Sequence, residues 1–422
     1  MPVFERSELE NGLRVVTAPM PQAKSVACFV MIAAGSRYET RESSGIAHFA
    51  EHMFFKGTTR RPSARDIAGE IDAIGGEFNA FTGKEYTGYY VKCAAEHRDV
   101  ALDVLVDMLR NSRFDPEEIE REKGVIVEEM NMYIDTPRDY VDSVYDTLLY
   151  GDQPLGWDII GTKETVRGAS RETFTDYLDR WYRAPRMVVG VGGNLGEGLP
   201  ELLGGLLGNV PNGAEEVPEQ VRWGQKTPQV LVHHKDSDQA HLRFGVHSLE
   251  LGHPDRYALT LLSTVLGGGM SSRLFTEVRE RRGLAYYIFA HNQAYTDAGT
   301  LFAQGGVDIA RIDEAVGTIV NEFSRIAAEP VDADELEKAR SYTKGRLVLT
   351  LEDPKGMIMF GLRSEVLEGR LREPDEVLAG LDAVTAEDIQ RVAGELIRND
   401  RLNLALVGPF DDPSRFSDQL SL

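Results

Sequence analysis

Residues 48–52 have the sequence His48-Phe49-Ala50-Glu51-His52, and this stretch decides how the rest of the chain is interpreted. On an α-helix, positions i, i+3 and i+4 share one face, so His48, Glu51 and His52 would point in the same direction. Two imidazoles one turn apart suit a single zinc ion, which favours nitrogen ligands. A carboxylate beside the open position of the metal is placed to act as a general base on a water. The alternative is a helix with two incidental histidines and a surface glutamate.

A third ligand is expected from a second predicted helix, residues 116–133, for which Asp115 is the N-cap. Its apolar stripe has helical spacing and comprises Ile119, Ile126, Met130 and Tyr133. Glu122 and Glu129 lie within that stripe, whereas Glu128 projects from nearly the opposite side. A carboxylate on a core-facing stripe is costly unless something pairs it, and a metal ion would do so. Glu129 is therefore the predicted third ligand and Glu122 a supporting carboxylate. The alternative is that both side chains lie on a solvated flank.

Three segments together carry a resemblance to a known family: SSGIAHFAEHMFFKGT at 43–58, GGEFNAFTGKEYTGYY at 75–90 and REKGVIVEEM at 121–130. The H-x-x-E-H order inverts the commoner zinc-peptidase motif and is the inverzincin signature. The chain resembles the pitrilysin-family zinc metallopeptidases, in the subfamily of mitochondrial processing peptidase and its bacterial relatives. The resemblance implies one zinc per chain on His48, His52 and Glu129, with Glu51 as catalytic base and Glu122 as supporting acid.

The same resemblance implies how a substrate would be held. Asn79, Ala80 and Phe81 match the strand where the family binds extended peptides, although an ordinary strand with a turn-prone asparagine fits equally well. Arg279 and Tyr286 match an arginine and a tyrosine that the family brings to the scissile bond. Intact motifs in one chain favour a homodimer whose active sites are completed by the partner chain. The alternatives are the active subunit of a heterodimer with an inactive paralogue, or a non-catalytic scaffold subunit.

The charge of the chain limits its partners. With 46 basic and 68 acidic residues, the net charge is −22, which argues against nucleic acid and anionic membranes as partners. We favour solubility as the role of this charge; an acidic chamber that attracts basic peptides is the alternative. No apolar run approaches the length of a bilayer span. The first residues show no signal or transit pattern, so a cytoplasmic location is expected.

The order of predicted elements indicates a structural duplication. In the first half, Asn11-Gly12 predicts a hairpin turn, strands are predicted at 25–33, 77–82 and 87–91, and helices near 44, 63–74, 96–109 and 116–133. In the second half, strands are predicted at 229–234, 241–246, near 285 and 300, and at 402–407, and helices at 254–266, 272–281 and in four stretches to 398. Because strands and helices cluster in blocks, we expect an α+β fold.

Each half is expected to form a mostly antiparallel sheet flanked by helices, as in the processing-peptidase (LuxS-like metallohydrolase) fold of the family. The predicted domains are 1–212 and 229–422, joined by a Gly/Pro-containing linker over 213–228. The triple glycine 267–269 lacks the spacing of a phosphate-binding loop and predicts a flexible turn. Cys28 and Cys93 lie in apolar alternating runs and are expected to be buried thiols rather than a disulfide framework.

Overall fold

The structure is a computed structural model that describes residues 2–213 and 217–422. The chain forms two compact units, each built from three separate segments. The first unit comprises Met1–Met130, Asp158–Glu219 and Val348–Pro374, and the second comprises Asn131–Trp157, Gln220–Leu347 and Asp375–Leu422. Within the described ranges, no helix is both long enough and apolar enough to cross a membrane.

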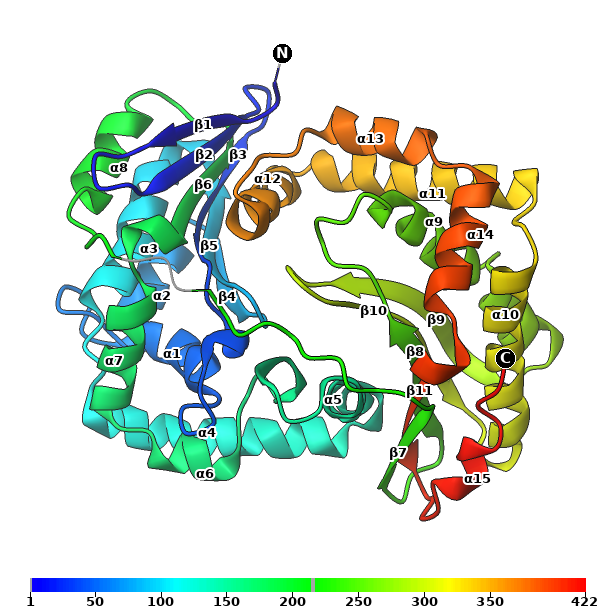
Figure 1. Ribbon diagram of the computed structural model, residues 1–422. Helices are drawn as coiled ribbons and strands as arrows, with labels where there is room; N and C mark the ends of the chain where they lie inside the picture. The colour runs from blue at the N-terminus through cyan, green and yellow to red at the C-terminus, as the bar shows by residue number, and fades with distance from the viewer. Residues whose placement is uncertain (1, 214–216) are drawn as a thin grey trace. The chain divides into compact units, whose positions relative to one another are not determined.

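The first unit is a six-stranded sheet with helices on both faces (Figure 1). Its strands are β1 (Glu5–Glu8), β2 (Arg14–Pro19), β3 (Ser25–Ile32), β4 (Glu77–Thr82), β5 (Thr87–Ala94) and β6 (Met187–Gly193), in the order β1-β2-β6-β3-β5-β4. Its helices are α1 (Ile46–Phe54), α2 (Ala64–Ala73), α3 (Arg98–Asn111), α4 (Pro116–Asp135, which ends in the second unit), α6 (Lys163–Gly168), α7 (Arg171–Trp181), α8 (Leu199–Leu207) and α12 (Pro354–Glu368). All strand pairs are antiparallel except β2 with β6.

The second unit is a five-stranded sheet of the same design. Its strands are β7 (Gln229–His234), β8 (Ala240–His247), β9 (Ala285–Ala294), β10 (Gly299–Val307) and β11 (Asn403–Gly408), in the order β7-β11-β8-β10-β9. Its helices are α5 (Pro137–Tyr150), α9 (Arg256–Gly267), the π-helix η5 (Phe275–Arg281), α10 (Ile312–Ala328), α11 (Ala333–Leu351, which ends in the first unit), α13 (Pro374–Asp382), α14 (Ala386–Leu396) and α15 (Ser414–Ser417).

The two sheets share one topology. If β2, β6, β3, β5 and β4 are matched with β7, β11, β8, β10 and β9, then both the spatial order and every strand direction agree. The parallel pair occupies the same place in both sheets, and the rest of each ladder is antiparallel. This agreement confirms the predicted α+β fold of two structurally related domains. In this match, β4 and β9 are equivalent edge strands.

A helix from the other half of the sequence covers one face of each sheet. Helix α12 packs on β2, β3 and β6, and α5 packs on β7, β8 and β11. Glycines allow the close approach, because a Cβ at Gly190 would lie 2.4 Å from Leu362 Cδ1 and one at Gly245 would lie 2.5 Å from the Tyr145 hydroxyl. An ion pair also ties each helix to its sheet: Glu365 to Arg14 at 3.0 Å, and Asp142 to Arg243 at 2.5 Å.

These two helices make the observed units differ from the expected division into 1–212, a linker at 213–228, and 229–422. Helix α5 belongs to the first expected domain but packs in the second unit, and α12 belongs to the second but packs in the first. The physical reason is that each sheet has two apolar faces, and its own helices cover only one of them. Residues 214–216 of the expected linker lie outside the described residues.

Most local predictions agree with the structure. Ser63 caps α2 in a reciprocal capping box with Asp66, and the Asp115 side chain accepts a hydrogen bond from the Glu117 amide at the start of α4. Cys28 and Cys93 are buried free thiols. One position of the predicted apolar stripe is wrong: Tyr133 is exposed, because the buried face of α4 ends at Met130.

Candidate metal centre

The position of the motif helix is set by a buried carboxylate at its N-terminus. Glu39 accepts hydrogen bonds from the backbone amides of Gly45 at 2.8 Å and Ala47 at 2.7 Å. These are among the amides that a helix leaves unpaired at its first turn. Burial raises the pKa of Glu39 to about 8, although the two backbone hydrogen bonds oppose this shift. Glu39 therefore holds the start of α1 at Ile46, two residues before His48.

Three predicted ligands converge between α1 and α4. One ligand atom from each of His48, His52 and Glu129 lies within 4.8 Å of the others. The Nε2 atoms of His48 and His52 are 3.7 and 3.6 Å from the two oxygens of Glu129. Ligands about 2.1 Å from a tetrahedral zinc are about 3.4 Å apart, so these separations suit a single ion. Glu128, the neighbouring acid, is exposed and lies outside this cluster.

The donor atoms of the cluster fit a metal ion. Glu129 Oε2 is buried and makes no hydrogen bond, which is unusual for a carboxylate oxygen in a protein interior. Burial raises the pKa of Glu129. Burial, together with the neighbouring His52, lowers the pKa of His48 to about 3, so its imidazole is neutral and able to coordinate. A cation bound here would compensate the buried carboxylate.

Glu122 is hydrogen-bonded to one of the predicted ligands. The Nδ1–H of His52 donates a hydrogen bond to Glu122 Oε1 at 2.9 Å, which leaves Nε2 as the coordinating nitrogen. Lys56, two residues beyond the end of α1, pairs with the other oxygen of Glu122 at 2.5 Å. Burial opposes ionisation, but the hydrogen bonds to His52 and Lys56 outweigh it and lower the pKa of Glu122. Burial likewise opposes the charge on His52, and Glu122 with Glu129 raises the pKa of His52 above its usual value.

Glu51 lies on the same helix face as the two histidines and is held by a residue of β4. The Thr82 hydroxyl donates a hydrogen bond of 2.5 Å to Glu51 Oε2. Burial raises the pKa of Glu51, while the Thr82 bond and the nearby His52 oppose the shift. A raised pKa suits a group that must accept a proton and later release it.

Three supporting residues were not found from the sequence: Glu39, Lys56 and Thr82. Lys56 lies beyond α1, which ends at Phe54, so helical spacing does not place it. A signal existed for Thr82, which shares a strand face with Phe78 and Ala80 by period-two alternation. No pattern in the sequence shows that Glu39 reaches the first turn of α1.

The predicted substrate-binding residues lie on the edge strand β4, which pairs only with β5 in the described structure. Asn79 Oδ1 accepts a hydrogen bond from the Ala80 amide at 2.8 Å. The Ala80 side chain packs on the core between the sheet and α1. The Phe81 ring packs on the opposite core, against Tyr86 and over Gly88. Phe81 is therefore a packing residue of the strand, and Asn79 and Ala80 remain at its free edge.

The predicted arginine and tyrosine lie together in the second unit. Arg279 is on the π-helix η5, and its guanidinium carbon is 5.4 Å from the centre of the Tyr286 ring on β9. The same guanidinium is 4.7 Å from the Phe275 ring. The Tyr286 side chain is 77% exposed, which is unusual for a large aromatic residue on a strand. Tyr286 is therefore accessible to another molecule, and Arg279 lies against its ring.

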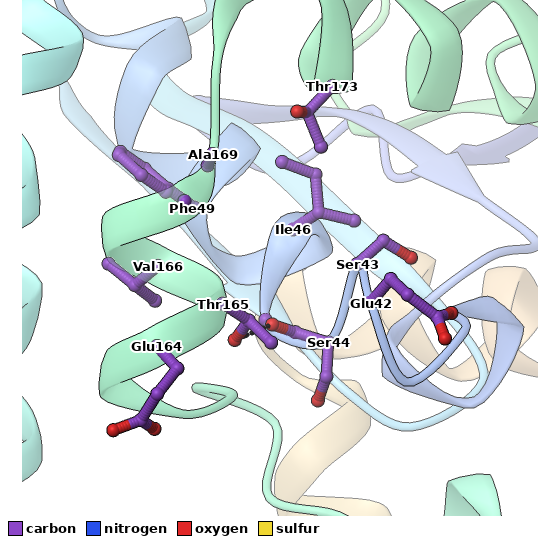
Figure 2. Close-up of a pocket in the computed structure, with 12 residues that line it drawn as sticks. Glu42, Ser43, Ser44, Ile46, Phe49, Glu164, Thr165, Val166, Ala169 and Thr173 are labelled. Carbon is purple, nitrogen blue, oxygen red and sulfur yellow. Dashed lines mark hydrogen bonds between the residues drawn. The ribbon is translucent and has the colours of Figure 1, made fainter.

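A hollow of about 260 Å³ lies at the N-terminal end of α1, on the side of α6 (Figure 2). Its lining includes Ser44, Ile46, Phe49 and Glu164, and Thr165 donates to the Ser44 carbonyl at 2.6 Å. None of the converging ligands lines this hollow. Because Glu39 already occupies the amides of Gly45 and Ala47, the helix end offers them to no anion here. The hollow is therefore separate from the cluster of possible metal ligands on α1 and α4.

Known proteins resemble this chain over most of its length. Residues 14–163 match the insulinase domain model of peptidase family M16, and residues 168–342 match the model of the M16 inactive domain. YmxG, an uncharacterized zinc protease of Bacillus subtilis, is 38% identical over 407 residues, which cover 96% of this chain and 98% of YmxG. ML0855, an uncharacterized zinc protease of Mycobacterium leprae, is 34% identical over 421 residues, which cover 99% of this chain and 94% of ML0855.

Solved structures show the same fold. The crystal structure of a protease from Helicobacter pylori superposes with a TM-score of 0.89 at 22% identity, over 96% of this chain and 100% of that one. At this identity, the likeness establishes the fold alone. The curated relatives are more similar in sequence and are matched over nearly their whole length. The chain therefore belongs to the insulinase family of peptidases, family M16.

Proposed function

We propose that this chain is a zinc-dependent endopeptidase that cleaves unfolded peptides. The observation that carries the proposal is the convergence of His48, His52 and Glu129 on one point, with Glu51 beside them on the same helix. The relatives named as zinc proteases support zinc as the metal. We propose one ion per chain, held by these three residues. When bound, zinc would supply a Lewis acid that acidifies the attacking water and polarises the scissile carbonyl.

The residues of the chain would then divide the work of peptide hydrolysis. Glu51 would take a proton from the water as its oxygen attacks the carbonyl carbon, and would deliver that proton to the leaving amine. Glu122 would keep His52 in the orientation and tautomer that ligation needs. The free edge of β4 would hold the substrate as an added strand, because backbone hydrogen bonds give affinity with little dependence on sequence.

We further propose that the active enzyme is a homodimer in which Arg279 and Tyr286 act on the site of the partner chain. The exposure of Tyr286 and the contact between the two side chains support this role. The side chains of Arg279 and Tyr286 would donate hydrogen bonds to the oxyanion that forms on the substrate carbonyl. An enclosed dimer chamber would admit peptides and exclude folded proteins. The cytoplasmic location stays a prediction.

The decisive experiment compares Glu51→Gln with His52→Ala and the wild type. Glu51→Gln should bind as much zinc as the wild type and cleave no peptide, whereas His52→Ala should lose both zinc and activity. Zinc content is measured by mass spectrometry of the native protein, and cleavage with an internally quenched fluorogenic peptide. Zinc loss in Glu51→Gln equal to that in His52→Ala would refute the role of Glu51 as base.

A mixing experiment tests the dimer. Glu51→Gln chains and Tyr286→Phe chains should each be inactive, and their mixture should recover part of the activity. Recovery is expected because a mixed dimer pairs an intact Glu51 with an intact Tyr286 from the other chain. Native mass spectrometry of differently tagged chains controls for subunit exchange. If the chains exchange and no activity returns, the site is completed within one chain.

A further inference from the structure

The Glu51 carboxylate is held at one oxygen by a residue from outside its own helix. The 2.5 Å hydrogen bond from Thr82 reaches Oε2, which leaves Oε1 to receive a proton. The terminal torsion of a glutamate is broad, so the helix backbone alone does not select the direction of the carboxylate. A single donor placed at the end of a strand does select it. We propose that Thr82 is the positioning residue of Glu51, an inference that rests on the proposed function.

Thr82 is well placed for this role because the turn that follows it is clamped. Ser36 and Arg37 donate their backbone amides to the carbonyls of Gly83 and Lys84, at 3.1 and 2.8 Å. The Arg37 side chain pairs with Glu85 at 2.7 Å, and both side chains are at most 2% exposed. A buried pair of this kind is costly to break, since either partner alone would be an uncompensated charge.

Glycine permits the close contact between the two segments. A Cβ at Gly35 would lie 2.2 Å from the carbonyl oxygen of Gly83. Residues on both sides of Gly35 therefore run directly against the turn between β4 and β5. The buried Thr87 hydroxyl adds a bond to the Ala34 carbonyl at 2.9 Å. The end of β4, and Thr82 with it, is consequently fixed by the fold rather than by a loose loop.

The same short segment also fixes the helix that carries Glu51. Two residues after Arg37, Glu39 accepts the amides of Gly45 and Ala47 at the start of α1. Residues 35–39 thus hold the turn after Thr82 through one set of bonds and the first turn of α1 through another. Residues 35–39 therefore hold both the strand end that carries the donor, Thr82, and the helix that carries the acceptor, Glu51. The substrate would pair along β4, so the strand that binds the peptide also carries Thr82, which orients the base Glu51.

The test removes the Thr82 hydroxyl while keeping the volume of the side chain nearly unchanged. Thr82→Val removes the donor, Thr82→Ser retains it, and Thr17→Val on β2 controls for the same change at a strand position outside the site. We expect kcat of Thr82→Val on an internally quenched fluorogenic peptide to fall on the order of 10- to 100-fold. KM, zinc content and Tm should stay at the wild-type values. Thr82→Ser and Thr17→Val should keep kcat within about threefold of the wild type.

Several results would overturn the role of Thr82. They are an unchanged kcat in Thr82→Val, an equal loss of kcat in Thr82→Ser, or zinc loss in Thr82→Val. An equal loss in Thr82→Ser would mean that the methyl group matters rather than the hydroxyl. If the wild type itself shows no cleavage that depends on zinc and Glu51, the proposed function fails instead.

A second measurement does not depend on catalysis. In protein labelled with carbon-13 at glutamate carboxyl carbons, the Glu51 signal is identified by its absence in Glu51→Gln. That signal should move in Thr82→Val and stay in place in Thr82→Ser, because only the first variant loses the donor. An unmoved signal in Thr82→Val would overturn the inference whatever the activity of the protein.

Discussion

Replacing Glu122 should weaken zinc binding without removing a ligand. Among the described residues, Glu122 reaches the metal cluster through the Nδ1–H of His52, at 2.9 Å, and its other oxygen pairs with Lys56. The side chain is 5% exposed, so water cannot substitute for it without rearrangement. In Glu122→Gln the amide oxygen can still accept from His52, and what is lost is the negative charge. In Glu122→Ala both the charge and the acceptor are lost.

The expected magnitudes follow from these contacts. Loss of a hydrogen-bonded partner of a metal ligand typically costs about 10- to 100-fold in metal affinity. We therefore expect Glu122→Gln to raise the Kd for zinc about 10-fold and Glu122→Ala about 100-fold, which correspond to about 1.4 and 2.7 kcal/mol. Glu129→Gln replaces a charged ligand and should weaken binding further than either variant.

The assay is competition between the protein and a chromophoric zinc chelator at neutral pH. Glu128→Gln is the matched control, because Glu128 is an exposed acid on the same helix and lies outside the cluster. Its Kd should equal that of the wild type. Wild-type affinity in both Glu122 variants would refute the argument, as would a loss in Glu122→Gln as large as that in Glu129→Gln.

Three further outcomes are expected. Zinc affinity should fall as pH drops from about 8 to about 6, because the raised pKa of His52 lets a proton compete with the metal. A zinc affinity that stays constant over this pH range, measured by chelator competition, would contradict this. Leu362→Ala should lower the free energy of unfolding by about 2–5 kcal/mol in urea titrations, since Leu362 is fully buried under β6; a loss below about 1 kcal/mol would not fit. If acids line the chamber, basic peptides should be cleaved faster at low salt; a salt-independent rate leaves the charge a solubility role.

The local pattern of the sequence was sufficient to select the three residues that converge in the cluster. Helical spacing alone places His48, Glu51 and His52 on one face, and the stripe on α4 distinguishes Glu129 from Glu128. The structure brings the same three ligand residues together. Short-range rules succeed here because each helix carries its ligands on the face that it must turn toward the other. The duplication was also visible, since the order of elements repeats along the chain.

Only the tertiary structure decided which helix covers which sheet. Nothing in the sequence of α5 or α12 shows that each packs in the unit opposite to its place in the chain. Both are helices with buried apolar residues, and such faces fit any apolar surface of the right shape. The choice depends on glycines and ion-pair partners that lie far away in sequence, such as Gly190 and Arg14.

The contacts of the supporting residues were hidden for the same reason. Thr82 is 31 positions from Glu51, and Glu122 is 66 positions from Lys56, so no local period relates them. Their contacts exist because α1, β4 and most of α4 belong to one unit, in which α1 packs against β4. The sequence by itself determined the kind of chemistry, through side chains one helical turn apart. Tertiary packing determined how these side chains are oriented, because their orientation depends on hydrogen bonds between elements that only folding brings within about 3 Å.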